Sequence, residues 1–445
     1  MPNIVIIGNG ISGITCARHV RKNSTDPITI ISAETNHFFS RTALMYIYMG
    51  HMSYEHTKPY EDWFWTKNNL QLVRGYVEGI DENSKTLSLK DQDDIKYDVL
   101  VIAAGSKPNK LGWPGQDVRG IQGLYSYQDL ETMERNTKDI QKAVIVGGGL
   151  IGIEMAEMLL SRNIPVTFLV RENQYWDNVL PKEEATMISQ HIREHQIDLR
   201  LGTELKEIVS DGNDVVSTII TDKDERIECQ FVGLTAGVTP NIDFLKNSNI
   251  ETERGVLINR YFETNIRDVY AVGDCAEFRD TIQDRNSIEQ VWYTGRMHGE
   301  TLARTLLGNK TEYIPGPWFN SAKFLDIEYQ VYGQVSNVPK DIEEHIYWEH
   351  PDGKKSIRII YNKSDKSIVG LNLMGIRFNH EVCDQWLKQK ASIDHVLGNL
   401  DEANFDPEFY NTNHNEVIKI YNLNNPGNEI KLKTRGKKQF GAISF

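Results

Sequence analysis

Cysteine is scarce in this sequence, and its few copies lie far apart. The 445-residue chain has four, at Cys16, Cys229, Cys275 and Cys383, and no two of them form a CxxC or CxxxxC pair. This spacing excludes a local redox disulfide, and also a zinc or iron–sulfur site built from these cysteines alone. We expect no metal site, and we interpret Cys16 as a packing residue on a helix.

A long apolar run and a net positive charge are also missing. No hydrophobic stretch approaches the roughly 20 residues of a membrane-spanning helix. A predicted strand begins at residue 3, which leaves no room for a signal peptide before it. The formal net charge of -13 argues against general nucleic-acid binding. We therefore expect a cytoplasmic protein of two or three domains without a transmembrane segment or a nucleic-acid partner.

The N-terminal stretch has the pattern of a dinucleotide-binding unit. A short β-branched run from Asn3 is followed by Gly8-x-Gly10-x-x-Gly13 and then by an apolar-periodic segment, which predicts strand, glycine turn and helix. The glycines suit a tight turn, the approach of a pyrophosphate, and close packing of helix on strand. The next predicted strand ends on Glu34, 21 residues after the last glycine, where a carboxylate can accept hydrogen bonds from a ribose. A glycine turn without a ligand is the alternative interpretation.

The same pattern occurs a second time in the middle of the chain. The apolar run Ala143–Val146 precedes Gly147-x-Gly149-x-x-Gly152, and a helical pattern follows. Two such units in one chain are much more specific than one. They predict a protein that binds two dinucleotides and transfers hydride or electrons between them.

The end of the second unit bears on which nicotinamide is used. Its second predicted strand ends at Val170, and Arg171 comes next. An acid at the strand end favours a free 2′-hydroxyl, whereas an arginine suits a 2′-phosphate, so the pattern leans slightly toward NADPH. Because the acidic residue Glu172 is next to Arg171, this preference for NADPH is only slight.

The segment between the first strands and the middle of the chain carries one notable cation. Residues 37–65 are rich in aromatics and predict a packed helical excursion. Arg41 lies near its start, and we expect its guanidinium to reach the phosphate side of the first site. Leu70–Ile80 and Lys85–Lys90 look like the strands of a hairpin.

Small residues and glycines follow three more predicted strands. Ala103-Ala104-Gly105 follow a strand that begins near Tyr97, Gly237 follows one that begins at Phe231, and Gly273-Asp274 follow one that begins at Asp268. Small side chains there allow close approach of a loop or ligand. The Asp274 carboxylate can hold hydroxyls of an extended cofactor, and a helix starting after it would support phosphates. A simple helix cap is the alternative for Gly273-Asp274.

Together these ordered motifs resemble those of the FAD-dependent pyridine nucleotide–disulfide oxidoreductase superfamily, over residues 1–335. The resemblance implies an α/β fold with two Rossmann-like dinucleotide-binding domains, one for FAD and one for NAD(P)H, plus a C-terminal α+β domain. The implied boundaries are 1–112 for the first part of the FAD-binding domain and 113–240 for the NAD(P)H-binding domain. The second part of the FAD-binding domain takes 241–315, and a C-terminal interface or partner domain takes 316–445.

Within the superfamily the chain resembles a branch without a redox disulfide. The single-cysteine position of coenzyme A disulfide reductases and NADH peroxidases falls at Thr42, whose hydroxyl cannot replace a thiolate. The loop around Arg41 and the segments 291–299 and 316–324 are similar to those of ferredoxin and rubredoxin reductases and of the N-terminal part of nitrite reductase large subunits. Two positions depart from the pattern: Tyr46 replaces a lysine of ferredoxin reductases, and Ala104 replaces the usual threonine.

The resemblance also implies the site residues. Glu154 is expected to be the catalytic residue, positioning the nicotinamide. The FAD site is expected to comprise Gly8, Gly10, Ile11, Ser12, Gly13, Glu34, Arg41, Thr42, Val77, Ala103, Ala104, Gly105, Gly273, Asp274, Trp292 and Trp318. The NAD(P)H site is expected to comprise Gly147, Gly149, Leu150, Ile151, Gly152, Arg171 and Gly237.

The implied function is an FAD-dependent NAD(P)H oxidoreductase that passes electrons to a separate carrier such as a ferredoxin or rubredoxin. One alternative is a flavoenzyme that reduces a small molecule, a quinone or oxygen, which would need an unforeseen role for Thr42 or Cys383. The other is a flavin-based redox-sensing interaction protein. The C-terminal domain is expected to support a homodimer. The basic segment 431–438 is either a solvated end or a docking element for an acidic redox partner or an anionic membrane surface.

Overall fold

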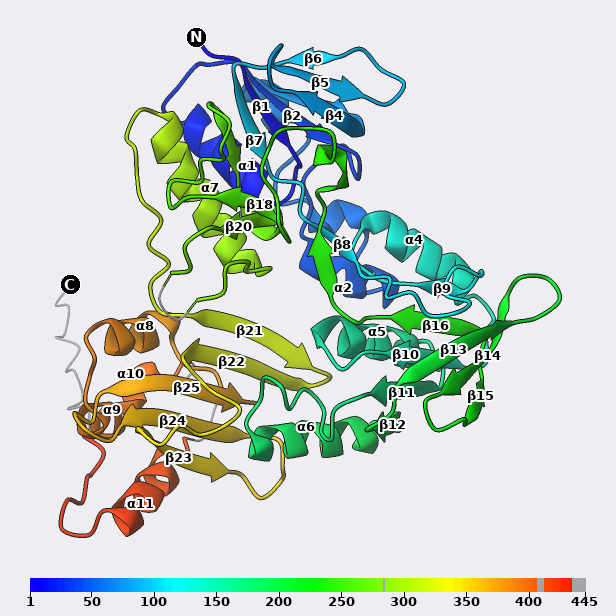
Figure 1. Cartoon of the computed structure of the whole chain (residues 1–445). Coiled ribbons are helices and arrows are strands. Elements are labelled where there is room, and N and C mark those ends of the chain that lie inside the picture. Colours follow the sequence, from blue (N-terminus) through cyan, green and yellow to red (C-terminus); the bar gives the residue numbers. More distant parts are fainter. Residues whose placement is uncertain (283–284, 406–411, 434–445) are drawn as a thin grey trace, which may run out of the picture. The chain divides into compact units, whose positions relative to one another are not determined.

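The structure, a computed structural model, describes residues 1–282, 285–405 and 412–433. The chain separates into two units (Figure 1). Unit 1 comprises Met1–Tyr175 and Ile192–Pro315, and unit 2 comprises Trp176–His191 and Gly316–Phe445. The predicted four-part division into domains stays a prediction. The basic segment 431–438 lies largely outside the described residues.

The first large sheet of unit 1 is parallel throughout and contains the first glycine motif. Its strand order is β19-β7-β1-β2-β3. These strands are β1 (Ile4–Ile7), β2 (Ile28–Ser32), β3 (Leu70–Arg74), β7 (Val99–Ile102) and β19 (Val269–Ala271). Every residue of β1 is buried, as expected for a central strand of a parallel sheet covered on both faces. The carboxyl ends of β1, β2 and β7 therefore meet at one edge.

The second large sheet of unit 1 has the same construction around the second motif. Its order is β12-β11-β10-β16-β9, again parallel. The strands are β9 (Ile121–Gln122), β10 (Ala143–Val146), β11 (Val166–Val170), β12 (Asp198–Leu201) and β16 (Phe231–Leu234). Helix α5 (Leu150–Ser161) follows β10 as α1 (Ile11–Arg21) follows β1. Helix α4 (Tyr127–Asn136) precedes β10 in sequence. The two predicted βαβ units are confirmed.

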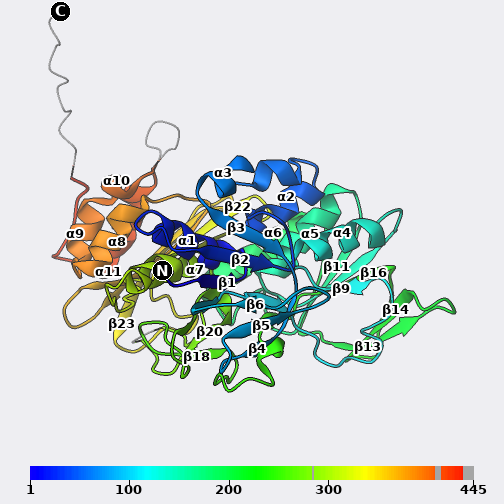
Figure 2. The same cartoon turned by 90° about the horizontal axis from the view of Figure 1, so that it is seen from above.

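The expectation that Leu70–Ile80 forms one strand is wrong. Strand β3 ends at Arg74 and belongs to the first parallel sheet, whereas β4 (Val77–Asp81) pairs antiparallel with β5 (Thr86–Leu89). Strand β6 (Ile95–Lys96) completes this three-stranded sheet (Figure 2). The chain changes sheets at Gly75, whose amide still bonds to the Ser32 carbonyl at the end of β2. Only the second half of the Leu70–Ile80 segment therefore forms the predicted hairpin, as β4 paired with β5.

Short elements complete unit 1. The expected helical excursion is present as α2 (Leu44–Tyr48), α3 (Trp63–Lys67) and two 3-10 turns, Arg41–Ala43 and Tyr54–Thr57. The other strands are β8 (Ser106–Pro108) with β17 (Val238–Pro240), β18 (Val256–Ile258) with β20 (Ala276–Phe278), and β13 (Leu205–Ser210) with β14 (Val216–Thr221) and β15 (Arg226–Glu228).

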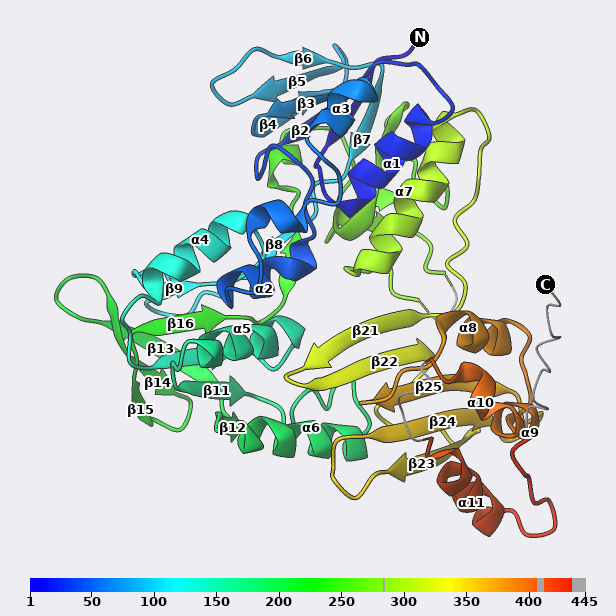
Figure 3. The ribbon, with the colours of Figure 1, turned by 180° about the vertical axis from the view of Figure 1, so that it is seen from behind.

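Helix α7 (Trp292–Leu306) lies against α1, as Figure 3 shows from behind. The contact is close because two glycines of α7 face α1. A Cβ added at Gly299 would lie 2.4 Å from the Ser12 carbonyl oxygen, and one at Gly295 would lie 2.8 Å from Ser12 Oγ. The N-terminal turn of α1 is thereby packed closely against α7.

Unit 2 is built on an antiparallel sheet of order β21-β22-β25-β24-β23. Its strands are β21 (Phe319–Phe324), β22 (Ile327–Gly333), β23 (Glu343–Glu349), β24 (Ser356–Asn362) and β25 (Ile368–Met374). The helices are α8 (His380–Lys388), α9 (Ile393–Gly398), α10 (Leu400–Ala403) and α11 (His414–Asn424), and most of α6 (Lys182–Glu194) belongs here too. This unit is the predicted α+β domain. In the parts of the chain that the structure describes, no helix has the length and apolar character needed to cross a membrane.

Candidate functional site

The two glycine turns have matching local geometry. Gly8 and Gly147 adopt φ values of +113° and +114°, which L side chains rarely tolerate. A Cβ on Gly8 would lie 2.1 Å from the Ala103 carbonyl oxygen, and one on Gly147 would lie 2.7 Å from the Thr235 carbonyl oxygen. Each first glycine therefore touches the backbone that follows a neighbouring strand of its sheet.

The middle glycine of each motif faces open space. A Cβ on Gly10 or on Gly149 would meet no protein atom within 4 Å. These glycines are the N-caps of α1 and α5, and neither helix has a side-chain cap hydrogen bond. An open approach to an uncapped helix N-terminus fits a pyrophosphate, which the amides and the helix dipole can bind. The residues present therefore fit the predicted dinucleotides.

A cavity of about 560 Å³ opens at the carboxyl ends of β1, β2 and β7. This volume lies in the usual range for cofactor sites. Residues from both glycine motifs and their sheets line the cavity, because the start of α5 contributes Leu150, Ile151 and Glu154. The predicted FAD-site residues that line it are Gly8, Gly10, Ile11, Ser12, Glu34, Arg41, Thr42, Val77, Ala103, Ala104, Gly105, Asp274 and Trp292.

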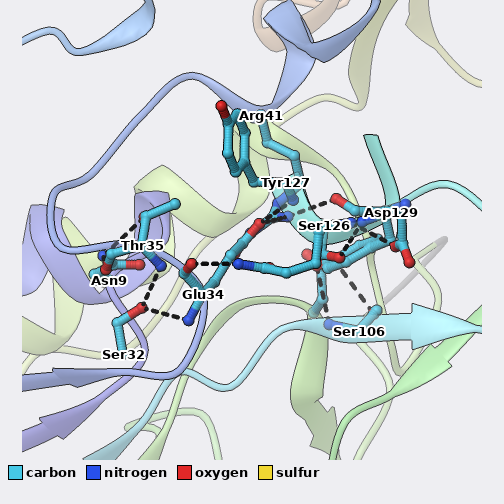
Figure 4. Close-up of polar contacts among 12 residues, drawn as sticks. Asn9, Ser32, Glu34, Thr35, Arg41, Ser106, Ser126, Tyr127 and Asp129 are labelled. Atoms are coloured by element: carbon cyan, nitrogen blue, oxygen red, sulfur yellow. Dashed lines mark hydrogen bonds and ion pairs between the residues drawn. The ribbon is translucent and has the colours of Figure 1, made fainter. Parts of the chain in front are cut away.

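Glu34 and Arg41 form a bidentate ion pair on the cavity wall (Figure 4). Arg41 Nη1 donates to Glu34 Oε1 at 2.8 Å and Nη2 donates to Oε2 at 2.5 Å. The amide of Tyr127, the first residue of α4, also donates to Oε1 at 2.8 Å. Burial alone would lower the pKa of Arg41, but the Glu34 carboxylate raises it. The predicted ribose acceptor and the predicted phosphate-binding cation thus contact each other directly.

Asp274 lies at the other end of the same polar chain. Its Oδ2 accepts from the Tyr125 hydroxyl at 3.1 Å and from Ser106 Oγ at 3.4 Å. The Tyr125 ring lies 4.4 Å from the Arg41 guanidinium, and its carbonyl accepts from Arg41 Nη1 at 2.5 Å. Burial raises the pKa of Asp274, while the Tyr125 hydrogen bond and the Arg41 charge oppose that shift. Tyr125 therefore links the two acids predicted to bind the cofactor: it contacts Asp274 directly and Glu34 through Arg41.

The helix expected directly after Asp274 is not there. The chain forms a 3-10 turn, Gly273–Cys275, and continues as strand β20. The next helix, α7, begins at Trp292. Gly273 has φ +75°, which suits a turn rather than a helix start, so neither phosphate support from a following helix nor a helix cap applies to this pair.

Several predicted residues lie outside the cavity lining. Gly13 and Gly152 pack against the carbonyls of Gly8 and Gly147. Gly273 lies in the turn just described, Arg171 follows β11, and Gly237 lies between β16 and β17. Trp318 belongs to unit 2. The roles given to all the predicted site residues stay predictions.

Sequence reasoning missed three residues of the site. Tyr125 and Ser106 carried no motif, and only the Ser126–Asp129 capping box indicated that α4 starts just after Tyr125. The third is His298 on α7, which is 2% exposed and accepts the Gly273 amide on Nδ1 at 3.1 Å. His298 lies in segment 291–299, which resembles ferredoxin reductases, but the resemblance gave it no role, and its partner Gly273 is 25 residues away.

His298 should make the stability of the fold pH-dependent. Burial, with a smaller contribution from the Arg285 charge, lowers its pKa from the ordinary 6.5 to about 3. Below about pH 6.5 the unfolded chain takes up a proton that the folded chain refuses, so stability falls as the pH drops toward 3. At about pH 5 this single group costs about 2 kcal/mol. Denaturant unfolding of the wild type and of His298→Asn at about pH 7.5 and about pH 5.0 measures it. The wild type should lose about 2 kcal/mol more than the variant, and equal losses would contradict the assignment.

Comparison with known proteins places the chain in a family. Residues 2–299 match the family described as "Pyridine nucleotide-disulphide oxidoreductase". The chain is 31% identical over 276 residues to the NADH-rubredoxin oxidoreductase of Clostridium acetobutylicum, covering 62% of this chain and 68% of that protein. It is 31% identical over 281 residues to the nitrite reductase [NAD(P)H] of Bacillus subtilis (strain 168), covering 62% of this chain but only 34% of that protein.

Solved structures agree on the fold. An NAD-dependent persulfide reductase from A. fulgidus superposes with a TM-score of 0.83 at 22% identity, covering 95% of this chain and 83% of that one. At this identity the likeness concerns the fold alone, and it confirms the predicted fold class. The match to the family, by contrast, extends over the whole first glycine motif, the second motif and the Asp274 turn. The chain therefore belongs to the pyridine nucleotide-disulphide oxidoreductase family, as the sequence predicted.

Proposed function

We propose that this protein is an FAD-dependent NAD(P)H oxidoreductase that passes electrons to a separate carrier such as a ferredoxin or rubredoxin. One observation carries the proposal: a single cavity is lined by the first glycine turn, by Asp274 and by Glu154 of the second nucleotide helix. Two dinucleotide sites that share a wall can bring their reactive rings together. The names of two relatives, which couple NADH or NAD(P)H to rubredoxin or nitrite, support this class of reaction.

Each group of residues has a distinct task in this proposal. The α1 N-terminus and Arg41 bind the FAD pyrophosphate, Glu34 accepts hydrogen bonds from its adenosine ribose, and Asp274 binds its ribityl hydroxyls. The α5 N-terminus binds the NAD(P)H pyrophosphate, and Glu154 orients the nicotinamide amide. Bound FAD would supply acceptance of a hydride from NAD(P)H and onward transfer of electrons to the carrier.

The proposal does not require a redox cysteine. All four cysteines are buried, and no described residue of the cavity lining is a cysteine. Burial raises the pKa of Cys16 to about 12 and of Cys275 to about 11, and it also raises the pKa of Cys383. Thiolates are the reactive form, so these side chains suit packing. This weakens the alternative in which Cys383 acts on a small molecule.

The choice of nicotinamide rests on the residues after β11. The Arg171 side chain is 70% exposed and its Nε donates to Glu172 Oε1 at 2.8 Å. An exposed guanidinium suits a 2′-phosphate, while the adjacent carboxylate partly offsets its charge. We therefore propose NAD(P)H with a slight preference for NADPH. The expected cytoplasmic location and homodimer also remain part of the proposal.

An anaerobic titration tests the proposal. NADPH and NADH should each bleach the absorbance of the bound flavin, and a ferredoxin or rubredoxin should then sustain rapid turnover. Glu154→Gln should keep bound flavin but slow the bleaching, because the nicotinamide is less well oriented. If neither nicotinamide bleached the flavin, the proposal would fail. Turnover with oxygen or a quinone alone would favour a small-molecule reductase, and a stable reduced complex without turnover would favour a redox sensor.

A further inference from the structure

His298 is a buried polar residue that the proposed chemistry does not use. It lies on α7, and its Nδ1 accepts the amide of Gly273, the residue immediately before Asp274. Asp274 in turn lines the cavity. A single backbone residue thus separates the imidazole from a carboxylate that faces the proposed FAD site.

Of the two ring nitrogens of His298, Nδ1 is the one that makes a hydrogen bond to a described residue. The imidazole packs among the rings of Phe262, Phe278 and Tyr313, with centroid distances of 4.9, 5.6 and 4.6 Å. Because Nδ1 accepts an N–H, the ring proton is on Nε2. Nε2 is buried and has no hydrogen-bond partner among the residues that the structure describes. The bond from the Gly273 amide to Nδ1 is therefore the polar contact that an apolar side chain could not provide.

The turn that His298 supports has no room to move toward α1. Gly273 has φ +75°, and a Cβ added to it would lie 2.3 Å from Ser12 Oγ. The imidazole supplies the acceptor for the Gly273 amide on the α7 side. If that acceptor were lost, the amide would stay buried without a partner, and the turn would have to shift to satisfy it.

We propose that His298 is a positioning residue that fixes the Gly273–Asp274 turn so that the Asp274 carboxylate is pre-organised for FAD. The inference rests on the proposed function, since it assumes that Asp274 binds the flavin cofactor. Asp274 keeps its bonds from Tyr125 and Ser106 only while the turn stays in place. Holding a ligand-binding group in its bound geometry raises affinity because less ordering remains to be done on binding.

The test is the affinity of apo protein for FAD, measured by the change in flavin fluorescence. His298→Leu removes the acceptor and should weaken FAD binding roughly 10- to 100-fold, the effect expected for an unpaired buried amide. His298→Asn places an oxygen near the position of Nδ1 and should keep affinity within about threefold of the wild type. Leu302→Ala, at a fully buried α7 position one helical turn after His298, is the control for a general loss of packing. It should lower stability without weakening FAD binding.

A double-mutant cycle separates positioning from a structural role. If His298 acts through Asp274, then His298→Leu should change FAD affinity less than about twofold in an Asp274→Asn background. Equal losses in both backgrounds, or wild-type affinity in His298→Leu, would overturn the inference. Should His298→Leu fail to fold, His298→Gln replaces it, since its acceptor lies near Nε2 rather than Nδ1 and should weaken binding as leucine does. Wild-type protein that does not bind FAD would overturn both this inference and the proposed function, whereas wild-type binding with unchanged variants overturns this inference alone.

Discussion

Replacing Gly8 with alanine is expected to abolish FAD binding. The new Cβ would lie 2.1 Å from the Ala103 carbonyl oxygen, and the backbone φ of +113° is itself unfavourable for alanine. Ala103 cannot move away easily, because its amide bonds to the Ile7 carbonyl and β7 is paired with β1 over four residues. Relieving the clash must separate the two strands that form the cavity floor, at a cost of about 3 kcal/mol or more. The loss of visible flavin absorbance in the purified variant measures the effect.

Two matched variants make this result specific. Gly212→Ala adds a Cβ in an exposed turn where it meets nothing within 4 Å, so flavin content should be unchanged. Gly147→Ala introduces the same strain in the second motif and should weaken NAD(P)H binding while the flavin remains bound. A Gly8→Ala protein that retained a full complement of FAD would show that the first motif is not the pyrophosphate site.

The glycine motifs could be predicted because their signal is local. Strand, turn and helix follow each other within about a dozen residues, and the first glycine is required by the backbone conformation itself. The same reasoning failed for Leu70–Ile80, because both halves are apolar strands and only the tertiary fold decides which sheet each one joins. Tyr125 and His298 could not be predicted for a related reason. Their partners Asp274 and Gly273 are 149 and 25 residues away in the chain.

The structural unit to which α6 belongs is another feature that the local sequence does not predict. Its sequence lies between β11 and β12 of the second nucleotide sheet, so the chain order alone places it there. In the structure most of α6 belongs to unit 2 with the C-terminal sheet. Glu184 of α6 forms a buried ion pair there with Arg358 of β24, which lies 174 positions later in the chain. No local sequence pattern predicts such a pair.

Removing Arg358 alone is expected to destabilise unit 2 strongly, because its partner Glu184 is buried. Arg358 Nε donates to Glu184 Oε1 at 2.7 Å, and Nη2 donates to Glu184 Oε2 at 2.8 Å and to Glu183 at 2.7 Å. The side chains of Arg358 and Glu184 are 4% and 0% exposed. Arg358→Met would leave the Glu184 carboxylate buried without its cation, which costs about 3–5 kcal/mol. Denaturant unfolding measures the loss, and Lys363→Met, which removes a half-exposed pair with Glu344, should cost less than about 1 kcal/mol.

A second substitution tells whether the loss comes from the orphaned charge or from lost packing. Glu184→Met added to Arg358→Met removes the remaining carboxylate of the pair, and buried ion pairs replaced by apolar side chains are often neutral or stabilising. The double variant should therefore regain most of the stability lost in Arg358→Met. Asn372, whose Nδ2 donates to Glu184 Oε1 at 3.2 Å, limits the recovery because that donor loses its acceptor. A double variant no more stable than Arg358→Met would mean that the pair contributes through its shape and hydrogen bonds rather than through compensation of charge.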